Sequence, residues 1–143
     1  MNKSFIATAN APAAIGIYSQ AVKVGQTTYL SGQIPLIPDT MVLVEGNIEA
    51  EVRQAFTNLA AVCEAAGGSL NHLAKVNVFL TDLSHFPVIN QVMEEYLVSP
   101  SLLVSTASRF GLHLAAPEVV ANQFKFLTLP TDNFWNIYQQ YVP

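Results

Sequence analysis

The sequence of 143 residues is poor in charge and in cysteine. Only 11% of the residues are charged, and Cys63 is the single cysteine. One cysteine excludes an internal disulfide and is typical of a reducing compartment. No run approaches the roughly 18 apolar residues that a membrane span needs, and the N-terminal apolar stretch is too short for the core of a signal peptide. The sequence therefore predicts a cytoplasmic protein with no membrane partner.

Basic residues are also scarce. Six Lys and Arg face ten Asp and Glu, which gives a formal net charge of −4, and the basic residues are spread singly. A nucleic-acid surface needs a basic stripe or patch. Nucleic acid is therefore not an expected partner, and a small-molecule ligand is favoured.

Motifs for metals and cofactors are missing. His72, His85 and His113 are scattered, without an HxxxH pair or a Cys/His cluster, and there is no GxGxxG or P-loop. Cys63 falls on the apolar stripe of a predicted helix, where a buried, inert thiol is expected. We expect no metal and no cofactor.

Apolar residues are abundant. They make up 51% of the chain, and the mean hydropathy is +0.34. A chain of this length is expected to form one domain, residues 1–143. Because a small domain leaves much of its surface exposed, part of this apolar surface is expected to face another subunit, so we expect a homo-oligomer.

The patterning up to residue 97 predicts an α+β domain. Segments 20–24 and 27–32 are rich in β-branched and aromatic residues, and Gly25-Gln26 between them indicates a hairpin turn. Helical spacing follows over 47–68, then an alternating strand over 72–83 and a second helix over 82–97. This order places two helices on one face of a mixed sheet.

The tail, residues 97–143, is less regular. Segments 101–107 (SLLVSTA) and 122–129 (NQFKFLTL) are candidate strands. The segment 132–142 is amphipathic and aromatic and is a candidate short helix.

Two polar clusters interrupt the strands, Gly16–Gln20 (GIYSQ) and Ser31–Gln33 (SGQ). Backbone N–H groups, a hydroxyl and an amide at the end of a strand can converge on a carboxylate or an oxyanion. The same residue types are also ordinary turn formers. The residues alone leave both interpretations open.

Motifs within residues 6–97 resemble the Rid family, also called the YjgF or L-PSP family. They are APAAIGIYSQAV, YLSGQIPLIPDT and NLAAVCEAAGGSLNHLAKVNVFLTDLSHFPVINQVMEEYL. The resemblance implies a chorismate-mutase-like α+β fold, a homotrimer and ligand sites in clefts between subunits. It also implies hydrolysis of 2-enamine and 2-imine acids to 2-oxo acids and ammonia. Other family members are described as ribonucleases or translation inhibitors.

The resemblance also implies site residues. Tyr18 matches the cleft tyrosine of the family, Ser31 and Gly32 match its ligand-contacting serine and glycine, and Asn90 matches an asparagine near the cleft. Ile17 stands where the family has proline, which loosens the turn that presents Tyr18.

The tail lacks two further family motifs, an arginine in P-A-R that clamps the substrate carboxylate and a glutamate on the last strand that orients water. Arg109 is the one arginine of the tail and the candidate substitute clamp, five residues beyond the expected place. Three functions stay open: a deaminase, a catalytically impaired trimer that binds a small ligand, and an L-PSP-type endoribonuclease or translation inhibitor.

The departure from the family pattern is abrupt at about residue 97. Independent drift would leave some family residues in place, whereas a reading-frame change in the gene would replace all of them together. Codons exist for Ser101 to Val104 whose shifted frame encodes Pro-Ala-Arg. A frame change near residue 97 is therefore our hypothesis for the tail.

Overall fold

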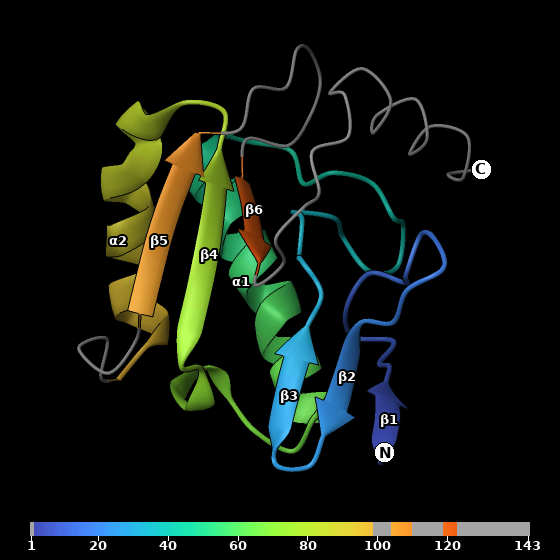
Figure 1. The fold of residues 1–143 in the computed structure, drawn as a ribbon. Coiled ribbons are helices and arrows are strands. Elements are labelled where there is room, and N and C mark those ends of the chain that lie inside the picture. The colour runs from blue at the N-terminus through green and yellow to red at the C-terminus, as the bar shows by residue number, and fades with distance from the viewer. Residues whose placement is uncertain (1, 99–103, 110–118, 123–143) are drawn as a thin grey trace.

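The computed structural model describes residues 2–98, 104–109 and 119–122. Within them the order of the regular elements is β-β-β-α-β-α-β-β (Figure 1). The predicted α+β class is confirmed. The candidate helix 132–142 and residues 123–129 of the second candidate tail strand lie outside the described residues.

The N-terminal sheet consists of three antiparallel strands in the order β1 (Lys3–Ile6), β2 (Ala21–Val24) and β3 (Thr27–Leu30). The predicted β2–β3 hairpin is confirmed, with Val24 opposite Thr27. Gly25 has φ +61°, the positive value that a two-residue hairpin turn needs at its first central position. Strand β1 was not predicted from the sequence. It adds an edge strand and starts the long 7–20 connection to β2.

A second, mixed sheet has the order β5-β4-β6. Strand β4 (Lys75–Leu80) runs parallel to β5 (Val104–Arg109) and antiparallel to β6 (Val119–Asn122). The candidate strand 101–107 overlaps β5. Of the candidate strand 122–129 only Asn122 is described, and it lies in β6; the tail strand that pairs with β4 begins at Val119, earlier than the alternation suggested.

Both predicted helices are confirmed. Helix α1 (Ile48–Ala65) begins at Asn47, whose side chain accepts a hydrogen bond from the Ala50 N–H over 3.1 Å. It ends before Gly67, which has φ +84°. Helix α2 (Phe86–Tyr96) has Pro87 in its first turn, where a missing N–H costs nothing. Neither helix is long and apolar enough to cross a membrane, nor is any other in the described residues.

The two helices cover one face of the strands (Figure 1). Alternate β4 side chains, Val76, Val78 and Leu80, are buried in the same core as the apolar faces of α1 and α2. The predicted α1 stripe is buried as well; its members are Val52, Phe56, Leu59, Val62 and Cys63. Within the described residues the helix-covered face is therefore packed, which directs the search for a ligand site to the edges and to the other face.

Candidate functional site

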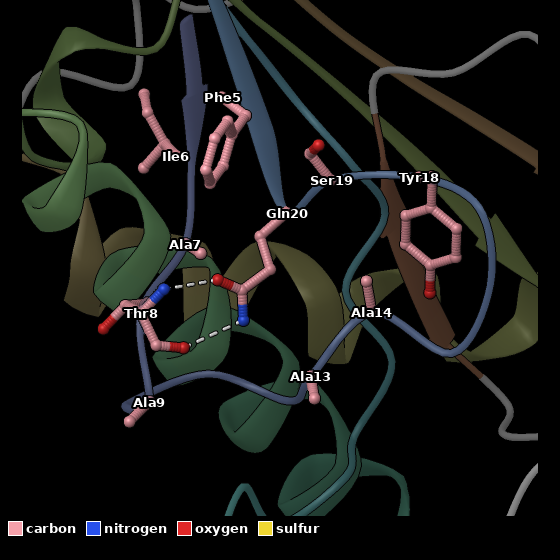
Figure 2. Close-up of a pocket in the computed structure, with 10 residues that line it drawn as sticks. All are labelled: Phe5, Ile6, Ala7, Thr8, Ala9, Ala13, Ala14, Tyr18, Ser19 and Gln20. Carbon is pink, nitrogen blue, oxygen red and sulfur yellow. Dashed lines mark hydrogen bonds between the residues drawn. The ribbon is translucent and has the colours of Figure 1, made fainter.

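The connection between β1 and β2 borders an open hollow of about 510 Å³. Figure 2 shows its lining: Phe5, Ile6, Ala7, Thr8, Ala9, Ala13, Ala14, Tyr18, Ser19 and Gln20. None of these side chains carries a charge, and several are methyl groups. The hollow can enclose a small molecule, but binding a carboxylate there would depend on backbone N–H groups, hydroxyls or a residue from elsewhere.

Tyr18 stands on a tight turn of this connection. Its N–H donates to the Gly16 carbonyl oxygen over 2.9 Å, and its hydroxyl accepts a hydrogen bond from the Ile15 N–H over 3.2 Å. The ring passes beside Gly16, where an added Cβ would lie 3.6 Å from it. The side chain is 52% exposed. The turn therefore fixes the ring but leaves half of its surface for a ligand or another subunit.

Ser31 and Gly32 follow the end of β3. The Ser31 N–H donates to the Gln20 carbonyl oxygen over 2.9 Å, and its hydroxyl donates to the Ser19 carbonyl oxygen over 2.5 Å. Because a serine hydroxyl has one proton, Ser31 in this arrangement offers a ligand only an acceptor oxygen.

The rest of the Ser31–Gln33 cluster is also used locally. The buried Gln33 amide donates to the Ser31 carbonyl oxygen over 3.2 Å. Of the two interpretations left open by the sequence, turn formation thus accounts for the side chains of Ser31 and Gln33. A contact of Ser31 or Gly32 with a ligand stays a prediction.

Asn90 lies on α2 with an exposed side chain. Helix α2 lies at one side of the molecule and the 7–20 connection at the opposite side (Figure 1). One chain therefore does not bring Asn90 and Tyr18 together. A site that contains both residues would need a second copy of the chain.

Arg109 is the last residue of β5, with Leu80 as its partner in the parallel register. Strands rise about 3.3 Å per residue, so its Cα lies roughly 16 Å along the strand from Val104. The family arginine was expected within SPSLLVST (residues 99–106), about five residues before Arg109, which corresponds to the start of β5. Arg109 therefore lies at the far end of β5 from that place, and its role as a clamp stays a prediction.

His72 and Cys63 are accounted for by their local surroundings. His72 Nδ1 accepts the Ser69 N–H over 3.0 Å and closes a short turn. Burial, with a smaller contribution from the charge of Glu64, raises the pKa of the Cys63 thiol to about 11. No group of three His, Cys, Asp or Glu side chains in the described part of the chain could hold a metal ion.

Two buried amides were not predicted as anchors; Gln20 was named only as the last residue of the polar cluster Gly16–Gln20, and Asn58 was not named as a candidate. The Gln20 side chain bonds to the backbone of Thr8, Ala11 and Pro12, and the Asn58 side chain bonds to the carbonyl oxygens of Ile34 and Leu36. The only sequence signal was a polar amide at a position where the hydrophobic pattern predicts a buried side chain. Each holds an irregular segment next to a candidate site residue.

Comparison with known proteins identifies the family. The family model described as Endoribonuclease L-PSP matches residues 8–118. The chain therefore belongs to the Rid family, also called the YjgF or L-PSP family.

The chain is similar to several named relatives. It is 50% identical over 98 residues to a 2-iminobutanoate/2-iminopropanoate deaminase of Dermatophagoides farinae, a match that covers 68% of this chain and 77% of that protein. It is 47% identical over 94 residues to a RutC family protein of Pyrococcus horikoshii, covering 66% and 75%. The crystal structure of RidA from the Antarctic bacterium Psychrobacter sp. superposes with a TM-score of 0.77 at 47% identity, covering 82% of this chain and 94% of that one. The predicted fold family is thus confirmed.

Proposed function

We propose that this protein hydrolyses reactive 2-imino and 2-enamine acids to 2-oxo acids and ammonia, as a cytoplasmic enzyme without a cofactor. The observation that carries the proposal is the 50% identity over 98 residues to a protein named for deamination of 2-iminobutanoate and 2-iminopropanoate. The hollow beside Tyr18 supports it, because its size suits a small molecule and its apolar lining suits a short apolar side chain.

The proposed reaction needs few protein groups. Water adds to C2 of the protonated imine to give a carbinolamine, and expulsion of ammonia then leaves the 2-oxo acid. The substrate carboxylate must be held while water attacks. In our proposal, Tyr18 and the Ser31–Gly32 turn contact the substrate, Asn90 approaches from another subunit, and Arg109 is the candidate carboxylate clamp.

We further propose that the protein acts as a homotrimer. Phe5, Val22 and Tyr29 are direct partners across β1, β2 and β3, so their side chains share the sheet face away from the core. Phe5 is 75% exposed and Tyr29 52%. An aromatic pair exposed on a sheet face favours burial against another copy. The separation of Asn90 from Tyr18 within one chain also favours a site shared between subunits.

A catalytically impaired trimer that binds a 2-oxo acid is the second candidate. The uncharged lining of the hollow and the engagement of the Ser31 hydroxyl with the Ser19 carbonyl favour it. The L-PSP-type endoribonuclease or translation inhibitor would require RNA binding, which the net charge of −4 disfavours.

One coupled assay separates the first two candidates. A serine or threonine dehydratase generates 2-aminoacrylate or its homologue, and release of the 2-oxo acid is followed with and without this protein at micromolar concentration. We expect acceleration. Its absence, together with saturable binding of 2-oxobutanoate, would leave the binding trimer as the function.

Two variants test the roles of residues in the same assay. Tyr18→Phe should lower the rate because it removes the hydroxyl of a side chain that lines the hollow. Arg109→Ala should abolish the acceleration if that residue holds the carboxylate, and full activity in this variant would place the clamp elsewhere. Lys23→Ala, a change of a charged β2 residue away from the hollow, is the control.

A further inference from the structure

The Gln20 side chain is buried, with 5% of the residue exposed, and its amide makes four hydrogen bonds to the backbone. Its Oε1 accepts from the Thr8 N–H over 2.6 Å. Its Nε2 carries two protons and lies within hydrogen-bond distance of three carbonyl oxygens, those of Thr8 (3.0 Å), Ala11 (3.1 Å) and Pro12 (2.8 Å), so that one proton is shared between two of them. Figure 2 shows the paired hydrogen bonds to Thr8. The amide accepts from the N–H and donates to the carbonyl oxygen of this residue, as the backbone of a neighbouring strand would.

Segment 8–12 depends on these bonds. It follows β1 but belongs to no strand or helix, so it has no ladder to satisfy its backbone groups. Thr8 and Ala9 line the hollow on this side. The position of segment 8–12, which forms the wall of the hollow on this side, therefore depends on the Gln20 side chain, which reaches across from the start of β2, together with the burial of Ala11 in the core.

The backbone of the same residue anchors the other parts of the site. Its carbonyl oxygen accepts the Ser31 N–H over 2.9 Å. Ser19, the preceding residue, accepts the Ser31 hydroxyl, and Tyr18 lies one residue further back. The wall, the tyrosine turn and the end of β3 thus meet at Gln20.

The geometry points to Gln20 as the positioning residue of the ligand site. Its amide holds segment 8–12 against β2 and so sets the width of the hollow beside Tyr18, without itself taking part in the chemistry. This inference rests on the proposed function for the identity of the ligand. The position of segment 8–12 relative to β2 does not depend on the proposed function.

Gln20→Met tests the inference, since it keeps the length and removes all four hydrogen bonds. Val92→Ala is the matched control, a buried change on α2 on the opposite side of the molecule. Hydrogen–deuterium exchange of a peptide spanning residues 7–14 reports the wall directly. Exchange should accelerate by about tenfold or more in Gln20→Met at a temperature where both variants stay folded, and should stay near wild type in Val92→Ala.

The ligand readout is the dissociation constant of 2-oxobutanoate, with KM and kcat in the coupled assay. A displaced wall should weaken binding and raise KM by about tenfold in Gln20→Met, with kcat changed less than about threefold, because the reacting groups are untouched. A loss of stability alone would move neither value in the folded protein. Equal changes in Val92→Ala would therefore overturn the inference.

In the Gln20→Glu variant, lowering the pH should restore part of the hydrogen bonding to segment 8–12. A protonated carboxyl can accept from the Thr8 N–H and donate to one carbonyl, whereas an ionised one faces three carbonyl oxygens without a donor. No other titratable group except the Tyr18 phenol lines the hollow. Exchange of segment 7–14 should therefore approach wild type at about pH 5 and approach Gln20→Met at about pH 8, since burial raises a carboxyl pKa.

The outcomes separate the two proposals. Unchanged exchange of segment 7–14 in Gln20→Met overturns the positioning role whatever the activity. If the wild type neither hydrolyses the imine nor binds 2-oxobutanoate, the proposed function is rejected. The claim that Gln20 shapes a site for this ligand is then rejected as well. Accelerated exchange with unaltered KM and binding would show that the wall does not shape the site.

Discussion

Asn58 of α1 donates a hydrogen bond to the backbone carbonyl oxygen of Leu36 over 2.8 Å, inside the core. The same amide donates to the Ile34 carbonyl oxygen over 3.0 Å and accepts from the Gln54 side chain over 2.9 Å. Asn58 is fully buried, and all of its hydrogen-bonding groups are used. These hydrogen bonds attach the segment that follows Gly32 to the first helix.

Replacing Asn58 by leucine should destabilise the protein by about 2–4 kcal/mol, because two carbonyl oxygens would lose their donor. Urea denaturation at constant m-value measures the change. Thr57→Ala, an exposed neighbour on the same helix, should cost no more than about 0.5–1 kcal/mol. Equal losses in the two variants would mean that the buried amide contributes nothing specific.

Ile17 occupies the centre of a three-residue turn, because the Tyr18 N–H donates to the Gly16 carbonyl oxygen. Its φ is not positive, since Met41 is the one non-glycine residue with positive φ in the described part of the chain. Such a turn has its central φ near −75°, close to the value that proline imposes. Ile17→Pro should therefore raise the free energy of unfolding by about 0.4–1 kcal/mol. Ile17→Ala serves as the control, and a loss of stability specific to proline would contradict the assigned turn.

Local patterns predicted the helices and the hairpin, because helical spacing and a turn glycine are properties of neighbouring residues. Strand β1 was not predicted from local patterns. It has four residues, only Ile6 points toward the core, and its evidence is the pairing with β2, some fifteen residues away. The start of strand β6 was predicted too late for a similar reason: 122–129 has the clearer alternation, but the pairing with β4 already begins at Val119.

The candidate site was predictable only in part. Motifs identified Tyr18 and Ser31, but the partners of Gln20 and Asn58 are backbone carbonyl oxygens, which any sequence would supply. Their identity depends on how two irregular segments fold back on the core. The sequence could not reveal either buried amide as an anchor.

The abrupt change near residue 97 has a direct genetic test. If a reading-frame change replaced the tail, the DNA across codons 95 to 105 should encode Pro-Ala-Arg in one alternative frame, opposite Ser101 to Val104. Sequencing this region of the gene decides it. Absence of Pro-Ala-Arg from both alternative frames would reject the hypothesis and leave the tail as an inherited variation.

Cys63 should be unreactive in the folded protein. Burial raises the pKa of its thiol to about 11, so at pH 8 the thiolate is about 100-fold scarcer than for a thiol of ordinary pKa. Labelling with an aromatic disulfide should be at least that much slower than in urea-unfolded protein. Rapid stoichiometric labelling under native conditions would show that α1 opens locally.

Arg53 connects the two helices through carboxylates on both. It lies 2.8 Å from Glu49 on its own helix and 2.7 Å from Glu95 on α2. The hydrogen bond from Arg53 holds the pKa of Glu95 below its ordinary value. A depressed carboxyl pKa contributes stability above the unfolded-state pKa, and this contribution is lost as the pH falls through the folded-state value.

Glu95→Gln should therefore lower the melting temperature at about pH 7, and the difference from wild type should shrink as the pH falls through the depressed folded-state pKa of Glu95, because the protonated carboxyl is then neutral like glutamine. Because the pair is partly exposed, high salt should also reduce the difference at neutral pH. Glu94→Gln, a change of the neighbouring exposed carboxylate on α2, is the control for net charge. A difference that grows on acidification would show that Glu95 stabilises the helix pair through packing instead of through its charge.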